Sequence, residues 1–421
     1  MQIEWVNHAS FVLRSGGYAV IMDPWLEGSV FDESWSLLAP SVFTNRDFET
    51  ITHIWFSHEH PDHFFPPNLL RIPPEIRARI HVIFQPTIDR RVVDFCRKVG
   101  FASVAELPAT WHPIGADLSI WCEPASRGDS WAAFRSASHT LLKLNDCIYL
   151  DKDELRPLKQ KIGKIDALVT QFSYASWWGN KHDAPAWEAA AAEQLDKIRR
   201  EVQVLEPAFV LLSASYVFFD HEENWYMNQW MNTVHKAFEY VSQLPGTAPV
   251  ALYPGDTWLA GTKHDSSLAL ARYAADQDRA LARGPQHKSK RVERNTLEEA
   301  GRDFIRRLRR RNSLLLLLRI PSARVFVTDY GEHFSLSLRG LTPAKQSLAD
   351  VSLSSSALLY CLNNDWGGET LFINGRFEVP RGGDWPSFSR WFAIAGANRH
   401  GTFYDFGYYA KKLTRVLGRA S

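Results

Sequence analysis

The sequence predicts an α/β protein in which β-sheets pack face to face and helices cover their outer sides. Short runs rich in β-branched and aromatic residues alternate with longer helix-prone runs along residues 1–260. Two of the first apolar runs flank the turn Gly16-Gly17, as in a β-hairpin, so the sheets are not purely parallel. The chain has 421 residues, of which 45% are hydrophobic, which is enough for the cores of two domains.

The expected elements follow one another in a regular order. A strand at residues 4–6 precedes the hairpin, which covers residues 10–13 and 18–22. A helix is expected after Pro66-Pro67, because proline is common at helix starts. Two more helices are expected at residues 87–99 and 186–202. The other expected strands are at residues 51–56, 118–122, 130–134, 140–144, 147–150, 167–172 and 209–214.

The composition changes after residue 256. The following stretch is charged and helix-prone, and its arginines, Arg306 and Arg310 among them, indicate a solvated helix face in preference to an anion site. Strands are expected again at residues 314–320, 324–328 and 334–338. The expected domains are a catalytic domain at residues 1–262, a charged helical linker at 263–312 and a small α+β domain at 313–421.

Charge and cysteine content exclude several classes of function. The chain has 48 Lys and Arg against 47 Asp and Glu, so neither nucleic acid nor a membrane is an expected partner. The four cysteines are far apart, which argues against disulfides, zinc knuckles and a Rieske iron–sulfur site. We see no signal peptide and no apolar run long enough to span a bilayer, so a cytoplasmic location is expected.

The most informative segment is residues 57–63, where three histidines and an aspartate follow an apolar strand. His58 and His60 are two residues apart, so at a strand end they face the same way and can hold one ion. The chain then turns at Pro61, which lets Asp62 and His63 point to a second position. Imidazole nitrogen and carboxylate oxygen are ligands of zinc, iron and manganese. The segment therefore predicts a metal centre.

The pattern His-x-His-x-Asp-His after a strand resembles the metallo-β-lactamase superfamily. Residues 23–28, with Trp35 downstream, and residues 213–221 resemble its UlaG-like branch, in particular the lyase-like domain of CMP-N-acetylneuraminate hydroxylase. The resemblance covers residues 1–260 and extends more loosely to diiron oxygenases of this fold. It implies a metallo-β-lactamase αββα sandwich, and it says less about the reaction, because one fold hosts many chemistries.

The resemblance also implies further ligands. A lone histidine that follows the first motif fits His139, and one that follows a later strand fits His221. The carboxylate that bridges two ions comes after a short apolar strand, and Asp153 fits that place, with Asp151 as the alternative. One ion would be held by His58, His60 and His139, and the other by Asp62, His63 and His221, with Asp153 between them.

Two reactions are compatible with this centre. The resemblance favours, slightly, a dinuclear-iron oxygenase that hydroxylates or N-oxygenates a small organic substrate with O2 and a separate electron donor. The alternative is a zinc or manganese hydrolase of an ester, amide or phosphoester. In either case Asp62 and Asp153 are the expected catalytic carboxylates, and His8 and Asp23 are expected beside the metals.

Overall fold

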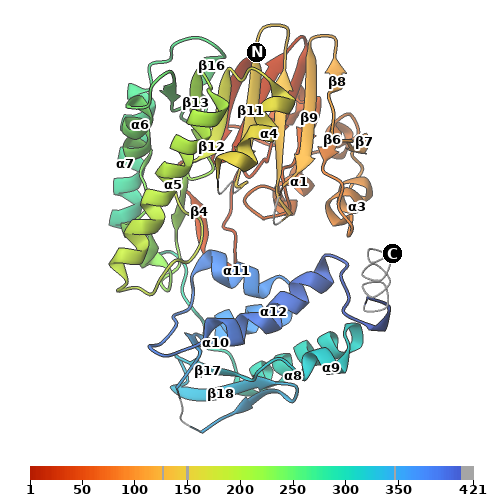
Figure 1. The fold of residues 1–421 in the computed structure, drawn as a ribbon, viewed down its shortest axis with the longest axis vertical. Helices are drawn as coiled ribbons and strands as arrows, with labels where there is room; N and C mark the ends of the chain where they lie inside the picture. Colours follow the sequence, from red (N-terminus) through yellow and green to blue (C-terminus); the bar gives the residue numbers. More distant parts are fainter. Residues whose placement is uncertain (126–127, 148–150, 346–347, 409–421) are drawn as a thin grey trace.

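The structure is a computed structural model that describes residues 1–125, 128–147, 151–345 and 348–408. Figure 1 shows two domains stacked along the long axis of the molecule. The N-terminal domain contains two β-sheets with helices outside them, and the C-terminal domain lies against one end of the sheets.

The N-terminal domain is built on two seven-stranded sheets. The first has the order β16-β1-β2-β3-β5-β6-β7, with β1 (Gln2–Asn7), β2 (Ser10–Ser15), β3 (Tyr18–Met22), β5 (His53–Trp55), β6 (His81–Phe84), β7 (Ser103–Glu106) and β16 (Thr257–Leu259). The second has the order β15-β13-β12-β11-β10-β9-β8, with β8 (His112–Gly115), β9 (Leu118–Pro124), β10 (Ser130–Arg135), β11 (Thr140–Asn145), β12 (Ala167–Gln171), β13 (Phe209–Ser213) and β15 (Ala248–Val250). Hairpins and the pairing of β1 with β16 are antiparallel. In contrast, β3, β5, β6 and β7 run parallel, as do β11, β12, β13 and β15.

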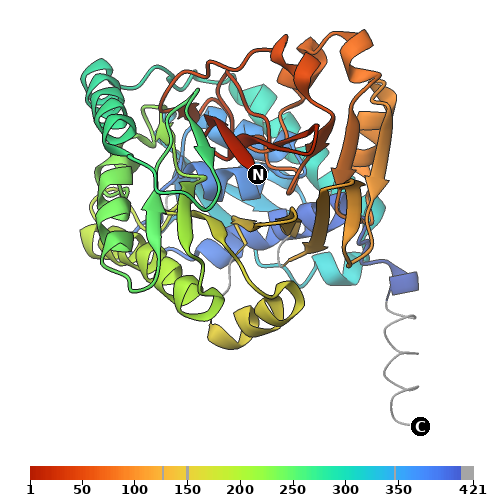
Figure 2. The same ribbon diagram turned by 90° about the horizontal axis from the view of Figure 1, so that it is seen from above.

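Four layers result from the alternation of side chains along the strands. In β3, Val20 and Met22 face the second sheet, and Ile21 faces the helices, because successive side chains of a strand point to opposite faces. Trp55 of β5 and Phe134 of β10 meet edge to face between the sheets, with ring centroids 6.2 Å apart. Helices surround the two sheets (Figure 2): α1 (Pro66–Arg71), α2 (Pro74–Arg77), α3 (Arg91–Lys98), α4 (Lys152–Ile162), α5 (Ala184–Leu205), α6 (Val234–Ser242) and α7 (Ser267–Arg283).

Short elements at the end of the sandwich extend toward the C-terminal domain. Strands β4 (Trp35–Leu37) and β14 (Val217–Phe219) form a separate antiparallel pair. A single 3-10 turn follows β14 at Trp225–Gln229. Another, Asp47–Thr50, lies at the other end of the sandwich, where it precedes β5. No helix among the described residues combines the length and apolar character needed to cross a membrane.

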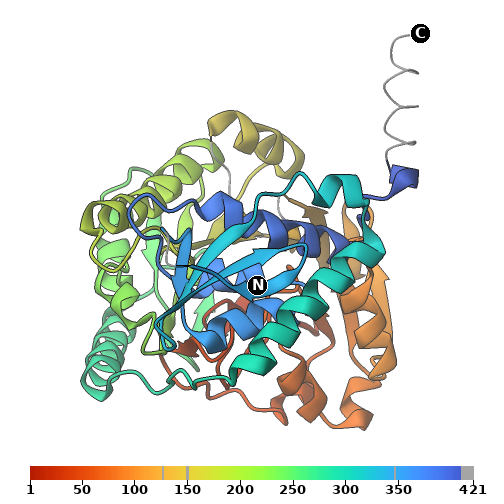
Figure 3. The ribbon, with the colours of Figure 1, turned by 90° about the horizontal axis from the view of Figure 1, so that it is seen from below.

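The C-terminal domain is α+β, as expected. Its sheet has the order β19-β18-β17-β20, with β17 (Ala323–Val327), β18 (Glu332–Ser337), β19 (Gly340–Pro343) and β20 (Val351–Leu353). The helices are α8 (Arg294–Arg311), α9 (Leu314–Leu317), α10 (Ser355–Asn363), α11 (Gly367–Asn374) and α12 (Trp385–Arg399). Seen from below, they cover the end of the sandwich (Figure 3). They share a core in which Phe304 of α8 stacks on Phe392 of α12, with ring centroids 4.9 Å apart.

The stretch expected as a linker is divided between the two domains. Tyr273 of α7 is buried in the N-terminal core, where it stacks on Tyr216 with ring centroids 4.3 Å apart. Phe304 of α8 instead belongs to the C-terminal core. Residues 263–312 therefore supply one helix to each domain, because both helices have an apolar face as well as a charged one.

Some expected elements differ from the observed ones. The run of leucines expected as a strand at residues 314–320 begins with the short helix α9, and an apolar run without alternation does not distinguish the two. The helix expected at residues 87–99 starts only at Arg91, because Arg90 adopts the left-handed conformation with φ 54°. Most of the strand expected at residues 147–150 lies outside the described residues.

Candidate metal centre

The motif after β5 lies at one edge of the sandwich. Asp23 follows β3 and residues 57–63 follow β5, its parallel neighbour, so both segments emerge on the same side. Asp146 follows β11 in the second sheet, and Asp129 comes just before β10, the antiparallel partner of β11. His8, in the turn between β1 and β2, completes the site.

Three overlapping groups of metal-binding side chains form there, each with donor atoms within 4.8 Å of one another. The outer group is His58, His60 and Asp129, the middle group is His58, His63 and Asp146, and the inner group is His8, Asp62 and His63. Each group contains two imidazoles and one carboxylate. Because the middle group shares one histidine with each of the others, the residues form a continuous cluster of the size that two neighbouring ions require.

The positions of the donor atoms fit cations better than hydrogen bonds. Nε2 of His58 and Nδ1 of His60 lie 2.9 Å apart, close to the roughly 3 Å between two ligands of one ion. Nε2 of His63 lies 3.3 Å from a carboxylate oxygen of Asp62 and 3.4 Å from one of Asp146, yet it has no hydrogen-bond partner. Oδ1 of Asp62 and Oδ1 of Asp146 are also buried without partners. Metal ions would satisfy these atoms.

Burial shifts the pKa values of the cluster in ways that a cation would relieve. Burial lowers the pKa of His58 to about 3, and the nearby His63 and His60 add to the shift, so its nitrogen is a free ligand at neutral pH. Burial also raises the pKa of Asp129 to about 7, with Asp146 as the second cause. A metal ion would favour the ionised carboxylates over the protonated ones.

Each of two motif histidines is oriented by a neighbour from its own domain. Nδ1 of His58 lies 2.9 Å from Oγ of Ser57, and Nδ1 of His63 lies 3.1 Å from Oδ2 of Asp23. Asp23 also accepts a hydrogen bond of 2.7 Å from Nζ of Lys143, which in turn donates to a backbone carbonyl at 2.6 Å. Burial opposes ionisation of Asp23, but Lys143 and His63 hold its pKa below the usual range. The predicted placement of Asp23 beside the metal ligands therefore agrees with the structure.

The backbone is strained where these side chains enter the site. His8 has φ 41°, Asp23 has φ 44° and Asn145, just before Asp146, has φ 49°. Left-handed conformations are uncommon for residues other than glycine and gather at functional sites. The three residues thus support the assignment of this edge as the functional one.

The structure corrects the expected role of His139. His139 lies in the turn that joins β10 to β11, and these antiparallel strands pair Arg135 with Thr140. It is therefore at the end of the hairpin opposite to the metal centre, where it contacts Ser138 and Gly261. Asp129 stands at the centre instead. The strands expected at residues 130–134 and 140–144 already imply this hairpin. The sequence therefore indicated that Asp129 and His139 lie at opposite ends of it.

The aspartates after residue 150 are also placed elsewhere. The side chain of Asp153 is 78% exposed on α4, where it pairs with Arg156. Asp151 caps the start of α4 by accepting hydrogen bonds from two backbone N–H groups. Asp146, which directly follows β11, occupies the place between the outer and inner groups. The prediction chose a carboxylate after the wrong apolar run, because residues 147–150 were taken for the preceding strand.

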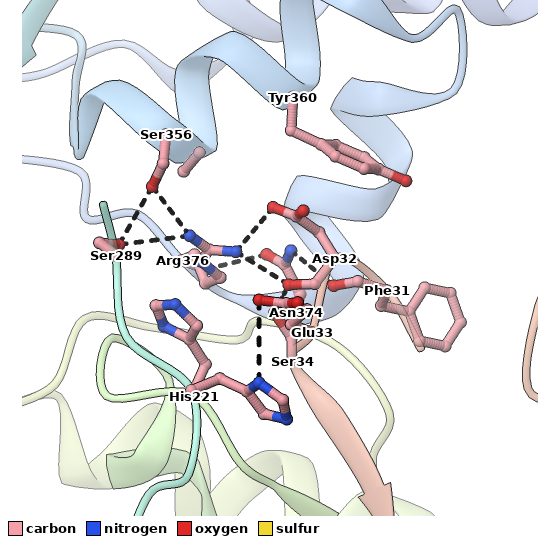
Figure 4. A network of polar contacts seen from close by, with 12 residues as sticks. Phe31, Asp32, Glu33, Ser34, His221, Ser289, Ser356, Tyr360, Asn374 and Arg376 are labelled. Atoms are coloured by element: carbon pink, nitrogen blue, oxygen red, sulfur yellow. Dashed lines mark hydrogen bonds and ion pairs between the residues drawn. The ribbon is translucent and has the colours of Figure 1, made fainter. Parts of the chain in front are cut away.

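His221 belongs to a separate polar network, shown in Figure 4. Its Nδ1 accepts the backbone N–H of Glu223 at 3.1 Å, and it joins none of the metal-binding groups found among the described residues. The centre of the network is Arg376 of the C-terminal domain, which is 3% exposed. Arg376 pairs with Asp32 at 2.6 Å and with Glu223 at 2.8 Å. The fourth histidine of the cluster is His8, which sequence reasoning placed only beside the metals.

A cavity between the two domains reaches the outer group. It has a volume of about 570 Å³ and includes His60 in its wall. Most of its lining is apolar, and both domains contribute aromatic rings to it: Phe31, Phe64, Phe65, Phe95, Tyr360 and Trp366. The cavity is large enough for a small organic substrate next to one end of the metal centre.

A comparison with known protein families finds a match for the N-terminal part of the chain. Residues 2–112 match the family model described as a beta-lactamase superfamily domain. This part of the chain is similar to the beta-lactamase superfamily. Together with the two sheets and their covering helices, the match identifies the N-terminal domain as a metallo-β-lactamase fold, whose members are mostly metal-dependent enzymes with a dinuclear metal site.

The individual proteins that are similar to this chain are named for different activities or cofactors. A protein of Mycolicibacterium smegmatis, whose name refers to a Rieske 2Fe-2S centre, is 27% identical over 234 residues, 51% of this chain and 43% of that protein. A metal-dependent hydrolase of Pyrobaculum islandicum is 34% identical over 65 residues, 15% of this chain and 24% of that protein. The structure of CmlA, a diiron β-hydroxylase from Streptomyces venezuelae, matches 61% of this chain and 53% of its own with 20% identity and a TM-score of 0.45. The match to the two curated relatives spans less than half of their length.

Proposed function

We propose that this protein is a non-haem dinuclear-iron oxygenase that acts on a small organic substrate. The observation that carries the proposal is the composition of the outer and inner groups. Each consists of two histidines and one aspartate. Two histidines and one carboxylate, with positions left open for other ligands, are typical of non-haem iron(II) oxygenases.

In the outer group, Asp129 takes the place that the sequence predicted for His139. With His139, the outer group would have had three histidines, a set that is well known for catalytic zinc. With Asp129, the outer group gains an oxygen donor in place of a nitrogen donor. Harder oxygen donors favour iron and manganese more than an all-imidazole set does.

The protein residues would hold, orient and shield the reacting groups. His58, His60 and Asp129 would bind one iron, His8, Asp62 and His63 the other, and Asp146 would lie between them. Iron held there supplies the reduction of O2. The apolar cavity beside His60 would bind the substrate and keep water away from it.

The overall reaction requires an external source of electrons. Insertion of one oxygen atom into a C–H or N–H bond reduces the other atom of O2 to water, which uses two electrons and two protons. All four cysteines are buried and unpaired in the part of the chain that the structure describes, and none belongs to a metal-binding group there. We therefore propose that a separate reductase or small iron–sulfur protein delivers the electrons.

Metal-dependent hydrolysis is the second candidate. The same imidazole and carboxylate ligands bind zinc, which supplies activation of water for attack on an ester, amide or phosphoester. The relative from Pyrobaculum islandicum is named a metal-dependent hydrolase, which favours this alternative.

Metal analysis together with oxygen uptake tests the proposal. We expect purified protein, reconstituted anaerobically with ferrous iron, to bind two irons per chain and to consume O2 when a chemical reductant is added. The Asp129→His variant is the matched control, because it restores three histidines to the outer group. It should retain zinc in preference to iron and lose oxygen uptake. Two zinc ions per chain, with no oxygen uptake by the iron form, would instead support the hydrolase.

A further inference from the structure

In each histidine of the motif, the ring nitrogen that points away from the metal cluster contacts another residue, but these partners differ in kind. For His58 the partner is Ser57 and for His63 it is Asp23, both in the N-terminal domain. For His60 the partner is Glu369, whose Oε1 lies 3.4 Å from Nε2 of the ring. Glu369 belongs to α11 of the C-terminal domain, so one metal ligand is contacted from the other domain.

The geometry of His60 defines what Glu369 does. Nδ1 of His60 faces Nε2 of His58 at 2.9 Å, so Nδ1 is the nitrogen directed at the outer metal position. A neutral imidazole that binds a metal through Nδ1 carries its hydrogen on Nε2. That N–H then needs an acceptor, and a carboxylate is a common one because it fixes the ring and increases the basicity of the ligand.

We propose that Glu369 is a positioning residue of the metal centre, supplied by the C-terminal domain. It accepts the Nε2–H of His60 and thereby keeps Nδ1 directed at the outer ion. The inference rests on the metal centre of the proposed function, but not on whether the reaction is oxygenation or hydrolysis. It gives the C-terminal domain a part in metal binding in addition to its part in forming the cavity.

Close packing at the start of α11 fixes the position of Glu369. A Cβ at Gly367 would lie 2.4 Å from the Cα of Cys361 in α10, and a Cβ at Gly368 would lie 2.3 Å from the Cβ of Phe392 in α12. Only glycine allows α11 to approach both helices so closely. The first turn of α11, which contains Glu369, is thus held against the body of its own domain.

Hydrogen bonds at the end of α11 tie the helix to the N-terminal domain. Nδ2 of Asn374 donates to the backbone carbonyl of Phe31 at 3.2 Å. Just after the helix, Arg376 pairs with Asp32 (Figure 4). The helix is therefore anchored at both ends, which sets Glu369 opposite His60 although its own side chain is 47% exposed.

Cobalt(II) binding tests the proposal without requiring any activity. We would measure the affinity and visible spectrum of cobalt(II) bound to the full-length protein, by competition with a chelator. Glu369→Ala should weaken binding of one of the two ions by about 10- to 100-fold, the usual effect of removing such a partner, and should alter the spectrum of that ion. Glu369→Gln keeps an acceptor oxygen for the Nε2–H, so it should restore most of the affinity.

The control is an imidazole–carboxylate contact that joins none of the metal-binding groups among the described residues. Nδ1 of His287, between α7 and α8, lies 3.8 Å from Oε2 of Glu33. His287→Ala should leave cobalt binding unchanged. Equal affinity of wild type and Glu369→Ala for both ions would overturn the positioning role alone. Failure of the wild type to bind cobalt would overturn the metal centre and this inference together, whereas two tightly bound ions without oxygen uptake would affect only the proposed reaction.

Discussion

At the inner end of the metal centre, His8, Asp62 and His63 are each at most 3% exposed and come from a single domain. At the outer end, the side chain of His60 is 25% exposed and faces the cavity between the domains. The ring of Phe31 lies against that of His60, with centroids 5.9 Å apart. The same cluster thus has one end enclosed by its own fold and another that is completed by a second domain.

This difference indicates that the two ends of the metal centre have different roles. The inner end is held by a buried network of charges in which Lys143 of the second sheet pairs with Asp23, which follows β3 of the first. The outer end is where a substrate can approach, and its surroundings depend on how the C-terminal domain docks. We expect changes at the inner end to affect folding and changes at the outer end to affect metal exchange and substrate binding.

The largest effect is expected for Asp23→Ala at the inner end. The variant leaves the fully buried Lys143 without its carboxylate partner, and breaking a buried ion pair in this way costs about 3–5 kcal/mol. Urea unfolding of the metal-free protein measures the loss. Asp153→Ala is the control, because that exposed side chain should change stability by less than about 0.5 kcal/mol.

A double variant separates the charge effect from a loss of packing. Adding Lys143→Met to Asp23→Ala removes the unpaired charge, so the double variant should be more stable than Asp23→Ala alone. If Asp23→Ala unfolds at the same urea concentration as Asp153→Ala, the buried network does not support the inner end.

The second effect concerns the rate at which each end releases its metal. Because the outer end opens to the cavity and the inner end is enclosed, a strong chelator should remove the two ions in separate phases at least about tenfold apart. Asp129→Ala should abolish the fast phase and leave one ion per chain, since it removes a ligand from the outer group. Stopped-flow absorbance with a coloured chelator follows both phases. Release of both ions in one phase from the wild type would contradict the distinction between the ends.

Much of the fold could be predicted from local patterns, and so could the part of the site that lies in one segment. His58, His60, Asp62 and His63 are within six residues after a strand, so no tertiary information was needed to group them. The remaining members come from other strand ends and turns, and their positions depend on strand register. The pairing of β10 with β11 places Asp129 and Asp146 at one end and His139 at the other, and the chain order of family ligands does not reveal this.

The contribution of the C-terminal domain could not be predicted from the sequence. Glu369 lies 309 residues after His60, and only the docking of the domains brings the two together. The sequence around it, with two glycines before the glutamate, indicates a turn as readily as the first turn of α11. The glycines are explained only by the packing of α11 on α10 and α12.

The smallest effect is expected in the loop that positions Phe31 at the outer end. Phe31, Asp32 and Glu33 are all left-handed, with φ of 53°, 60° and 55°, a conformation that costs an L-residue about 1 kcal/mol. The side chain of Glu33 is 69% exposed, so its replacement removes little packing. Glu33→Gly should therefore be about 1 kcal/mol more stable than Glu33→Ala in urea unfolding, because glycine adopts this conformation without strain. If the alanine variant is equally stable, the backbone at Glu33 is not strained, and left-handed geometry does not distinguish the outer end of the centre.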